Sequence, residues 1–139
     1  MPNTLVYRGI QKVLLAKFPE LEGPVRETFG SYYDLRTETP EAYPVFEDVF
    51  QGFLFTLLDS GNDAPLLRRI FSFLEEMADS QDKEVVNLLS IAVLEPLVFD
   101  RERIRRAWKY VGDRTKALAR ETARSRGWQE NLPAGEASP

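Results

Sequence analysis

Residues 82–98 read DKEVVNLLSIAVLEPLV, and they leave the fewest choices for how the chain folds. After Glu84 only Asn87, Ser90 and Glu95 interrupt the aliphatic residues, so a helix over this range is apolar on nearly every side. Such a helix must be covered on every side. The stretch is therefore predicted to be the central helix of the protein, and Pro96 is expected to kink or end it.

Apolar side chains also recur at helical spacing on both sides of this stretch. Residues 46–58 carry them at the i, i+3, i+4, i+7 positions of one face, and residues 64–79 repeat the pattern. Further helices are predicted over 4–17, 24–33 and 100–124. No segment alternates as a strand does. The prediction is an all-α fold of five or six helices, packed as successive antiparallel hairpins around the central helix.

The remaining segments are predicted to be turns, a loop and a tail. Residues 34–44 contain two prolines and are typical of a polar loop. In the turn SGND, Gly61 suits a left-handed cap, and Asn62 or Asp63 suits the cap of the next helix. One domain is therefore expected over residues 1–126, followed by a frayed or disordered tail over 127–139.

The segment 73–97 is rich in carboxylates: Glu75, Glu76, Asp79, Asp82, Glu84 and Glu95. Asp79 or Ser80 is expected to cap the central helix, and Asp82 and Glu84 suit the positive end of its dipole. Two other interpretations stay open. Several converging carboxylates would bind a metal, and a carboxylate pair in a polar cleft would support acid–base chemistry.

Glu95 lies on the helix that is predicted to be buried. A buried carboxylate needs a partner, because removing its charge from water is costly. Arg68 or Arg69 on the preceding helix is the expected partner, with free backbone N–H groups as the alternative.

The chain contains no cysteine and no histidine. Disulfides, thiolate zinc sites and cysteine nucleophiles are excluded, as are histidine ligands and Ser-His catalytic arrangements. No metal or other cofactor is predicted, and the protein is expected not to be an enzyme. The N-terminal residues lack the apolar core of a signal peptide, and no run approaches the roughly 18 apolar residues of a membrane span. A cytoplasmic protein without membrane contact is expected.

Charge is distributed unevenly. Residues 1–100 carry 8 basic and 17 acidic side chains, whereas residues 101–126 carry 10 basic and 3 acidic ones. Four of the basic residues are predicted to follow one line, about 23 Å long, on the last helix. They are Arg105, Lys109, Lys116 and Arg120. Such a line is the only candidate here for binding nucleic-acid phosphates; a solvated face, pairing with the acidic body and partner docking are the alternatives.

The run FSFLEEMADSQDKEVVNLLSIAVLEPL resembles a recurring segment of small all-helical bacterial proteins. The upstream EAYPVFEDVF and FPEL are also similar to that family, and the resemblance covers residues 18–112. Such proteins are often encoded beside polymorphic or contact-dependent toxins. The resemblance implies an immunity protein that neutralises a cognate toxin. The alternative is a helical regulatory or nucleic-acid-associated module that uses the basic last helix.

An inhibitor of this kind needs exposed carboxylates on rigid elements if the toxin has a basic site for an anionic substrate. The predicted partner-binding residues are Glu38, Glu41, Glu47, Asp48, Asp79 and Asp82. Four of these, Glu38, Glu41, Asp79 and Asp82, are expected to form one acidic patch at a shared end of the helix bundle.

Overall fold

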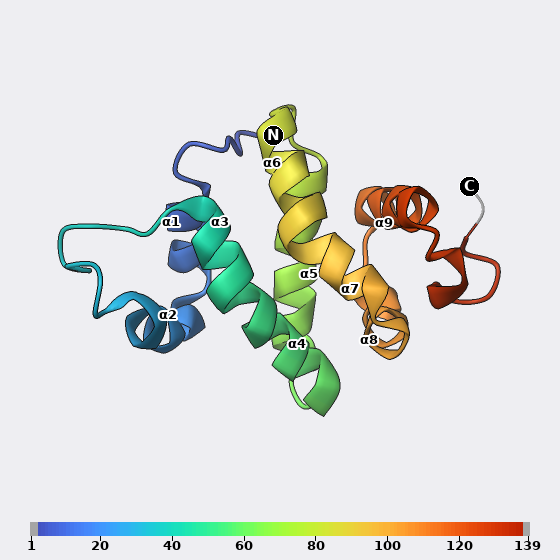
Figure 1. Ribbon diagram of the computed structural model, residues 1–139, viewed down its shortest axis with the longest axis horizontal. Helices are drawn as coiled ribbons and strands as arrows, with labels where there is room; N and C mark the ends of the chain where they lie inside the picture. The colour runs from blue at the N-terminus through green and yellow to red at the C-terminus, as the bar shows by residue number, and fades with distance from the viewer. Residues whose placement is uncertain (1–2, 138–139) are drawn as a thin grey trace.

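The computed structural model describes residues 3–137 of the 139-residue chain, and the regular secondary structure within this range is entirely helical, without a strand (Figure 1). The all-α prediction is thus confirmed. The α-helical segments are α1 Ile10–Lys17, α2 Glu22–Phe29, α3 Ala42–Val45, α4 Gln51–Ser60, α5 Ala64–Ala78, α6 Lys83–Leu89, α7 Glu95–Phe99, α8 Arg101–Ala107 and α9 Asp113–Arg126. None of the helices in this range is long and apolar enough to cross a lipid bilayer.

The predicted central helix consists of α6 and α7, joined without interruption by a π-helical turn at Ser90–Leu94. Its inward residues are fully buried, among them Leu88, Leu89 and Val93. Coverage is incomplete, however, because Ile91 is 47% exposed. The prediction that the helix is enclosed on all sides is therefore wrong for its outer face, which remains open in front of α5 (Figure 1).

Pro96 does not end this helix, because α7 continues through it, but the helix changes direction between α6 and α7 (Figure 1). Its ring nitrogen cannot donate to the carbonyl of Ala92, four residues earlier, so that carbonyl needs another donor. The side chain of Gln51, at the start of α4, donates to Ala92 O at 2.9 Å. The wider π-helical turn just before Pro96 and the bond from Gln51 together accommodate the proline within a continuous helix.

Removal of the Gln51 amide is expected to leave the Ala92 carbonyl unsatisfied. Gln51→Ala should lower the free energy of unfolding by about 1–3 kcal/mol, the usual cost of an unpaired, partly buried acceptor. Chemical denaturation would measure this. In a Pro96→Ala background the restored N–H can serve the carbonyl, so the same substitution should cost clearly less. An equal cost in both backgrounds would contradict this role for Gln51.

Helices α4 and α5 are separated as the sequence predicts. Gly61 adopts a left-handed conformation with φ 65°, and the Asp63 carboxylate accepts a hydrogen bond from Leu66 N at 3.1 Å. Pro65 occupies the first turn of α5, where its missing N–H has no cost. Helix α5 lies behind the pair formed by α3–α4 and α6–α7, and the buried faces of all three make the core (Figure 1).

The N-terminal helix is shorter than predicted. It begins at Ile10 rather than near residue 4, because Gly9 has φ 81° and the preceding residues bond to other acceptors. Leu5 N donates to the Asn3 side chain, and Tyr7 N donates to Asp82 Oδ2 at 2.8 Å. Helix α2 likewise begins and ends earlier than predicted. The loop after it closes at Glu41, so the predicted loop residues 42–44 are already helical.

The single basic helix predicted over 100–124 is wrong. Val111 is extended (φ −75°, ψ 129°), as is Gly112, and they separate α8 and a short 3-10 turn from α9. The cause is distant in sequence. The carboxylate of Glu75 on α5 accepts hydrogen bonds from Arg114 N, Thr115 N and Thr115 Oγ1 at 2.8–3.0 Å, and so caps a new helix at this point.

The segment after α9 is packed, contrary to the predicted frayed tail. Arg105 donates to the backbone carbonyls of residues 130, 131 and 132, and Leu132 is only 2% exposed. The side chain of Asn131 donates to the carbonyls of Val98 and Phe99 at the end of α7. This segment therefore contacts α7 and α8 through Asn131 and α9 through Glu136. The part of the prediction that concerns residues 138–139 lies outside the described residues.

Candidate protein-binding surface

Two tyrosines pack together where the N-terminal segment meets α3. The ring centroids of Tyr7 and Tyr43 lie 6.2 Å apart, and both side chains are half-buried. Hydrogen bonds to the turn between α5 and α6 hold the N-terminal segment in place. Tyr7 N donates to Asp82 Oδ2, and the Ser80 hydroxyl donates to Leu5 O at 2.8 Å. The aromatic pair is therefore fixed against the turn between α5 and α6.

Carboxylates surround this aromatic pair. Burial raises the pKa of Tyr7, and the nearby charges of Glu84 and Glu41 raise it further. Burial also raises the pKa of Tyr43, with additional effects from Tyr7, Glu47 and Glu84. Burial is the larger cause of each shift, and the smaller contributions from Glu41, Glu47 and Glu84 place these carboxylates near the two rings.

We call this region the tyrosine–carboxylate surface. Its members are Tyr7, Tyr43, Glu41, Glu47, Asp82 and Glu84. The three glutamates are exposed. No Lys or Arg within residues 3–137 forms an ion pair with any of the four carboxylates. Asp82 is used internally, because its two oxygens accept from Tyr7 N and Glu84 N.

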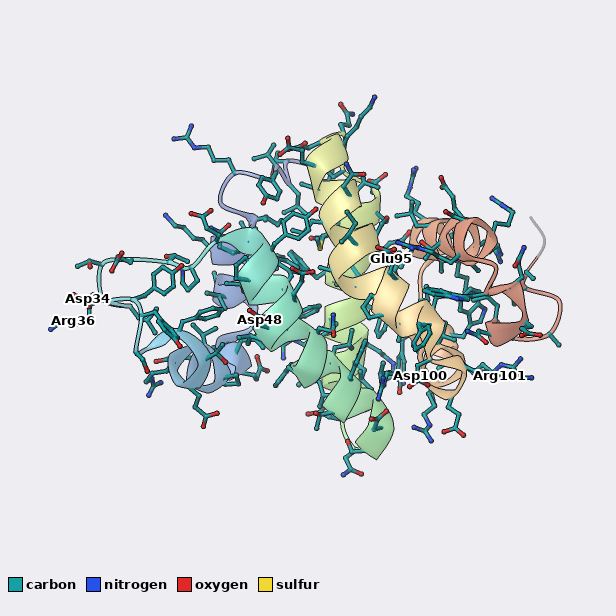
Figure 2. The ribbon with its side chains drawn as sticks, viewed as in Figure 1. Asp34, Arg36, Asp48, Glu95, Asp100 and Arg101 are labelled. Atoms are coloured by element: carbon teal, nitrogen blue, oxygen red, sulfur yellow. The ribbon has the colours of Figure 1, made fainter. Side chains whose placement is uncertain are left out.

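Three of the six predicted partner-binding residues, Glu41, Glu47 and Asp82, come together on this surface. The structure places the others elsewhere. Glu38 accepts from Asp34 N in the loop whose outer end carries Asp34 and Arg36 (Figure 2). The single patch expected from Glu38, Glu41, Asp79 and Asp82 is therefore divided, because the loop extends away from the α5–α6 turn (Figure 1).

Asp48 and Asp79 face other neighbours. Asp48 lies on the side of α3–α4 that faces α2, where it lines a shallow groove of about 400 Å³ with Pro24 and Gly52 (Figure 2). Asp79 forms an ion pair with Arg114 at 2.9 Å and does not cap α6. Asp82 caps α6 instead, and its own backbone N–H donates to the Ser80 hydroxyl oxygen.

The expected partner of Glu95 is also different. Glu95, labelled in Figure 2, pairs with Arg126 of α9, a helix that contacts α7. Arg68 is exposed, and Arg69 pairs with Glu20 at 2.8 Å. The sequence offered no sign of this contact, because it joins two helices 31 residues apart.

The structure offers little support for an acid–base pair or a metal site at the acidic stretch. Burial raises the pKa of Glu75, but the hydrogen bonds from Thr115 and Arg114 outweigh it and leave the pKa below its usual value. A carboxylate with that shift is a poor proton donor near neutral pH. Throughout residues 3–137, no group of three or more Asp or Glu side chains is arranged to hold a metal ion.

The four basic residues predicted to form a line are separated by the break before α9. Arg105 donates hydrogen bonds to three backbone carbonyls, and Arg120 pairs with Glu136 at 2.8 Å. Lys109 is exposed, and Lys116 lies over the ring of Trp108. The two halves of the predicted line therefore belong to different helices and cannot follow one straight path.

Two members of the surface, Tyr7 and Tyr43, were not selected from the sequence. Glu84 was selected only as a residue at a helix start, not as part of a binding surface. Tyr43 follows Glu41 by two residues in the segment EAYP, which was a local signal for it. Tyr7 had no such signal, because its position depends on the bond from its backbone to Asp82, 75 residues away.

A family model described as a domain of unknown function (DUF7674) matches residues 12–129. The matched range contains Glu41, Tyr43, Glu47, Asp82 and Glu84 and leaves out Tyr7. Comparisons with curated proteins and with solved structures give no significant match.

Proposed function

The chain belongs to the DUF7674 family of domains of unknown function, and within that family we propose that it is an immunity protein. It binds a cognate bacterial toxin and covers the active or substrate-binding site of that toxin, without chemistry of its own. The proposal starts from the resemblance of residues 18–112 to immunity-type proteins. The single structural observation that carries it is the tyrosine–carboxylate surface.

This surface has the physical character of a binding site for a basic protein. Ten of the 18 other Asp and Glu side chains in residues 3–137 are paired with Lys or Arg, such as Asp59 with Arg103 and Glu20 with Arg69. The four carboxylates around Tyr7 and Tyr43 are not. Tyrosine is enriched at the energetic centres of interfaces, because it combines a large apolar ring with a hydroxyl group. Unpaired charges around such a centre speed association and exclude partners of the wrong charge.

The elements that carry the surface are rigid, which favours tight binding. Glu41 precedes α3, Glu47 lies in the π-helical turn between α3 and α4, and Glu84 lies in the first turn of α6. Little conformational entropy is lost when residues on such elements bind a partner. A toxin with a basic site, built for an anionic substrate such as a nucleic acid or NAD, fits this charge pattern.

The alternative function, a nucleic-acid-associated module, relied on one line of four basic residues. That line is divided between α8 and α9, and two of its members bind groups of the chain itself. No observation in the described part of the chain favours the alternative.

Charge reversal should test the surface directly. The triple variant Glu41→Lys, Glu47→Lys and Glu84→Lys is expected to weaken binding to the toxin by at least about tenfold, or 1.4 kcal/mol. The probe is the C-terminal domain of the protein encoded directly upstream of this gene, and calorimetry would measure its affinity. Binding by the unmodified protein should also weaken as salt rises, because exposed charges are screened.

A matched control reverses three exposed glutamates outside the surface: Glu27, Glu121 and Glu130. The control has the same net charge as the triple variant and should bind almost as well as the unmodified protein at moderate salt. Equal losses in the two variants would mean that only overall charge matters. Unchanged binding in the triple variant, with its helical content retained, would remove the tyrosine–carboxylate surface from the interface.

A further inference from the structure

The last described segment holds to the body of the protein at two separate points. The first is the stretch up to Leu132, which Arg105 and Asn131 fix to α8 and α7. The second is Glu136 alone. Between them Gly135, with φ 82°, lets the chain turn back, and Glu136 N donates to Pro133 O at 3.0 Å. The segment therefore ends in a short turn that delivers one glutamate to α9.

That glutamate lies in a cradle of basic and aromatic side chains. Arg120 Nη2 donates to Glu136 Oε2, and Arg120 Nε donates to the backbone carbonyl of the same residue, both at 2.8 Å. Lys116 Nζ lies 5.3 Å from the centre of the Trp108 ring, and the Arg120 guanidinium lies 5.9 Å from it. We call Trp108, Lys116 and Arg120 the Glu136 cradle.

One donor in the cradle is unused. Trp108 is only 8% exposed, and its indole nitrogen is buried without a hydrogen-bond partner. Arg120 contributes most to lowering the pKa of Glu136, and Trp108 and Lys116 lower it further, so the indole N–H lies near this carboxylate without being aligned to it. A buried indole N–H usually has an acceptor. Glu136 thus satisfies the cradle only in part.

We propose that the Glu136 cradle is a recognition site for an acidic peptide segment of a protein partner, and that Glu136 occupies it in the free chain. The paired bonds from Arg120 define the ligand. One goes to a side-chain carboxylate and the other to the main-chain carbonyl of the same residue, which together describe a glutamyl residue within a peptide. A free anion has no main-chain carbonyl and would have to present two of its own oxygens to the guanidinium instead.

The surroundings favour such a ligand once Glu136 leaves. Lys116, a member of the cradle, makes no ion pair with any described residue. Glu136 is the ion-pair partner of Arg120, and its side chain is 30% exposed. A competing peptide can therefore reach the cradle, and it can also place a carboxylate in line with the Trp108 N–H.

The cradle lies on α9 and the 3-10 turn after α8, at the opposite end of the molecule from the loop before α3 (Figure 1). It is separate from the tyrosine–carboxylate surface and has the opposite charge. The inference is therefore independent of the proposed toxin interface.

The test uses the full chain and a short peptide with the sequence of residues 132–137, LPAGEA, blocked at both ends. The two tryptophan indole N–H signals in an NMR spectrum report on the site, with Trp128 as the internal reference. In Glu136→Gln the peptide should shift the Trp108 signal and bind at least about tenfold tighter than in the unmodified protein, whose own glutamate competes for the cradle.

Three comparisons make the result specific. The variant Glu130→Gln, which changes a tail glutamate whose side chain makes no ion pair, should behave as the unmodified protein does. A peptide with Gln in place of Glu should not bind Glu136→Gln measurably. Arg120→Lys in the Glu136→Gln background keeps the charge and loses the paired bonds, so it should weaken binding.

Equal peptide affinity for the unmodified protein and for Glu136→Gln would overturn the proposal, as would the absence of any peptide-induced shift in that variant. Inorganic phosphate that produces the same Trp108 shift at the same concentration would also overturn it, because the site would then be a general anion site rather than a peptide site.

Discussion

The substitutions Leu89→Ala and Leu94→Ala are each expected to lower the free energy of unfolding by about 2–5 kcal/mol. Leu89, the residue before the π-helical turn of the α6–α7 helix, is fully buried, and Leu94, the last residue of that turn, is 1% exposed. Both contact the core shared by α3–α4, α5 and α6–α7. Truncation leaves a cavity that these packed helices can close only partially, so the loss exceeds the simple transfer energy of the missing atoms.

Chemical denaturation followed by circular dichroism would measure the change. Asn87→Ala is the matched control, because Asn87 lies on the same helix and is exposed. Its effect should stay within about 0.5 kcal/mol. If neither leucine variant changed the melting temperature, the α6–α7 helix would not be the centre of the core.

The helices of the core can be predicted from the sequence because the signals for them lie within each helix or directly beside it. The apolar spacing in residues 46–58, 64–79 and 82–98 reflects one buried face or several, and the caps at Gly61 and Asp63 are short-range signals. The π-helical turns were not predictable in this way. The turn before Pro96 is stabilised by Gln51, a residue on another helix.

The errors in the C-terminal third have the same origin. Residues 104–118 keep helical spacing across Val111 and Gly112, so periodicity alone predicts one continuous helix. The deciding interaction is the carboxylate of Glu75, about 40 residues earlier. The dipeptide Gly112–Asp113 was a weak local sign of a helix start, and it stood within an otherwise regular pattern.

The candidate surface was predictable only in part for a comparable reason. Glu41, Glu47 and Asp82 were selected as exposed carboxylates near turns, which is a local property. Their gathering around Tyr7 and Tyr43 depends on the path of residues 3–9 across the α5–α6 turn. A single sequence contains no rule for that path.

The second large effect is expected at the start of α9. Glu75→Ala should lower the free energy of unfolding by about 2–3 kcal/mol, because it removes three hydrogen bonds to a charged acceptor. One of the donors, Thr115, is fully buried, so water cannot replace the lost bonds there. Glu76→Ala, a change of an exposed neighbour on α5, is the control and should cost less than about 1 kcal/mol.

The acid sensitivity of the protein should depend on the same carboxylate. The folded state lowers the pKa of Glu75 from its ordinary value of 4.5, so this group stabilises the fold at pH values above 4.5. That contribution is lost as the pH falls below 4.5 towards the lower folded pKa. The difference in stability between the unmodified protein and Glu75→Gln should therefore be constant near neutral pH and shrink in acid. A difference that grows in acid would contradict the shift.

Gly112 provides the sharpest test of the cap. A Cβ atom at this position would lie 2.5 Å from the carboxyl carbon of Glu75, so Gly112→Ala must displace the carboxylate from the helix start. The backbone itself accepts alanine, because Gly112 has φ −79° and ψ 170°. Gly112→Ala should therefore destabilise the unmodified protein by about 1–3 kcal/mol, through loss of the capping bonds.

The sign of this effect should reverse when Glu75 is already alanine. Without the carboxylate there is room for the methyl group, and replacing glycine with alanine at a compatible position stabilises by about 0.4–1 kcal/mol through the unfolded chain. Denaturation of the two single variants and the double variant completes the cycle. If Gly112→Ala destabilised both backgrounds equally, the glycine would be required for a reason other than the Glu75 cap, and the break between α8 and α9 would need a different cause.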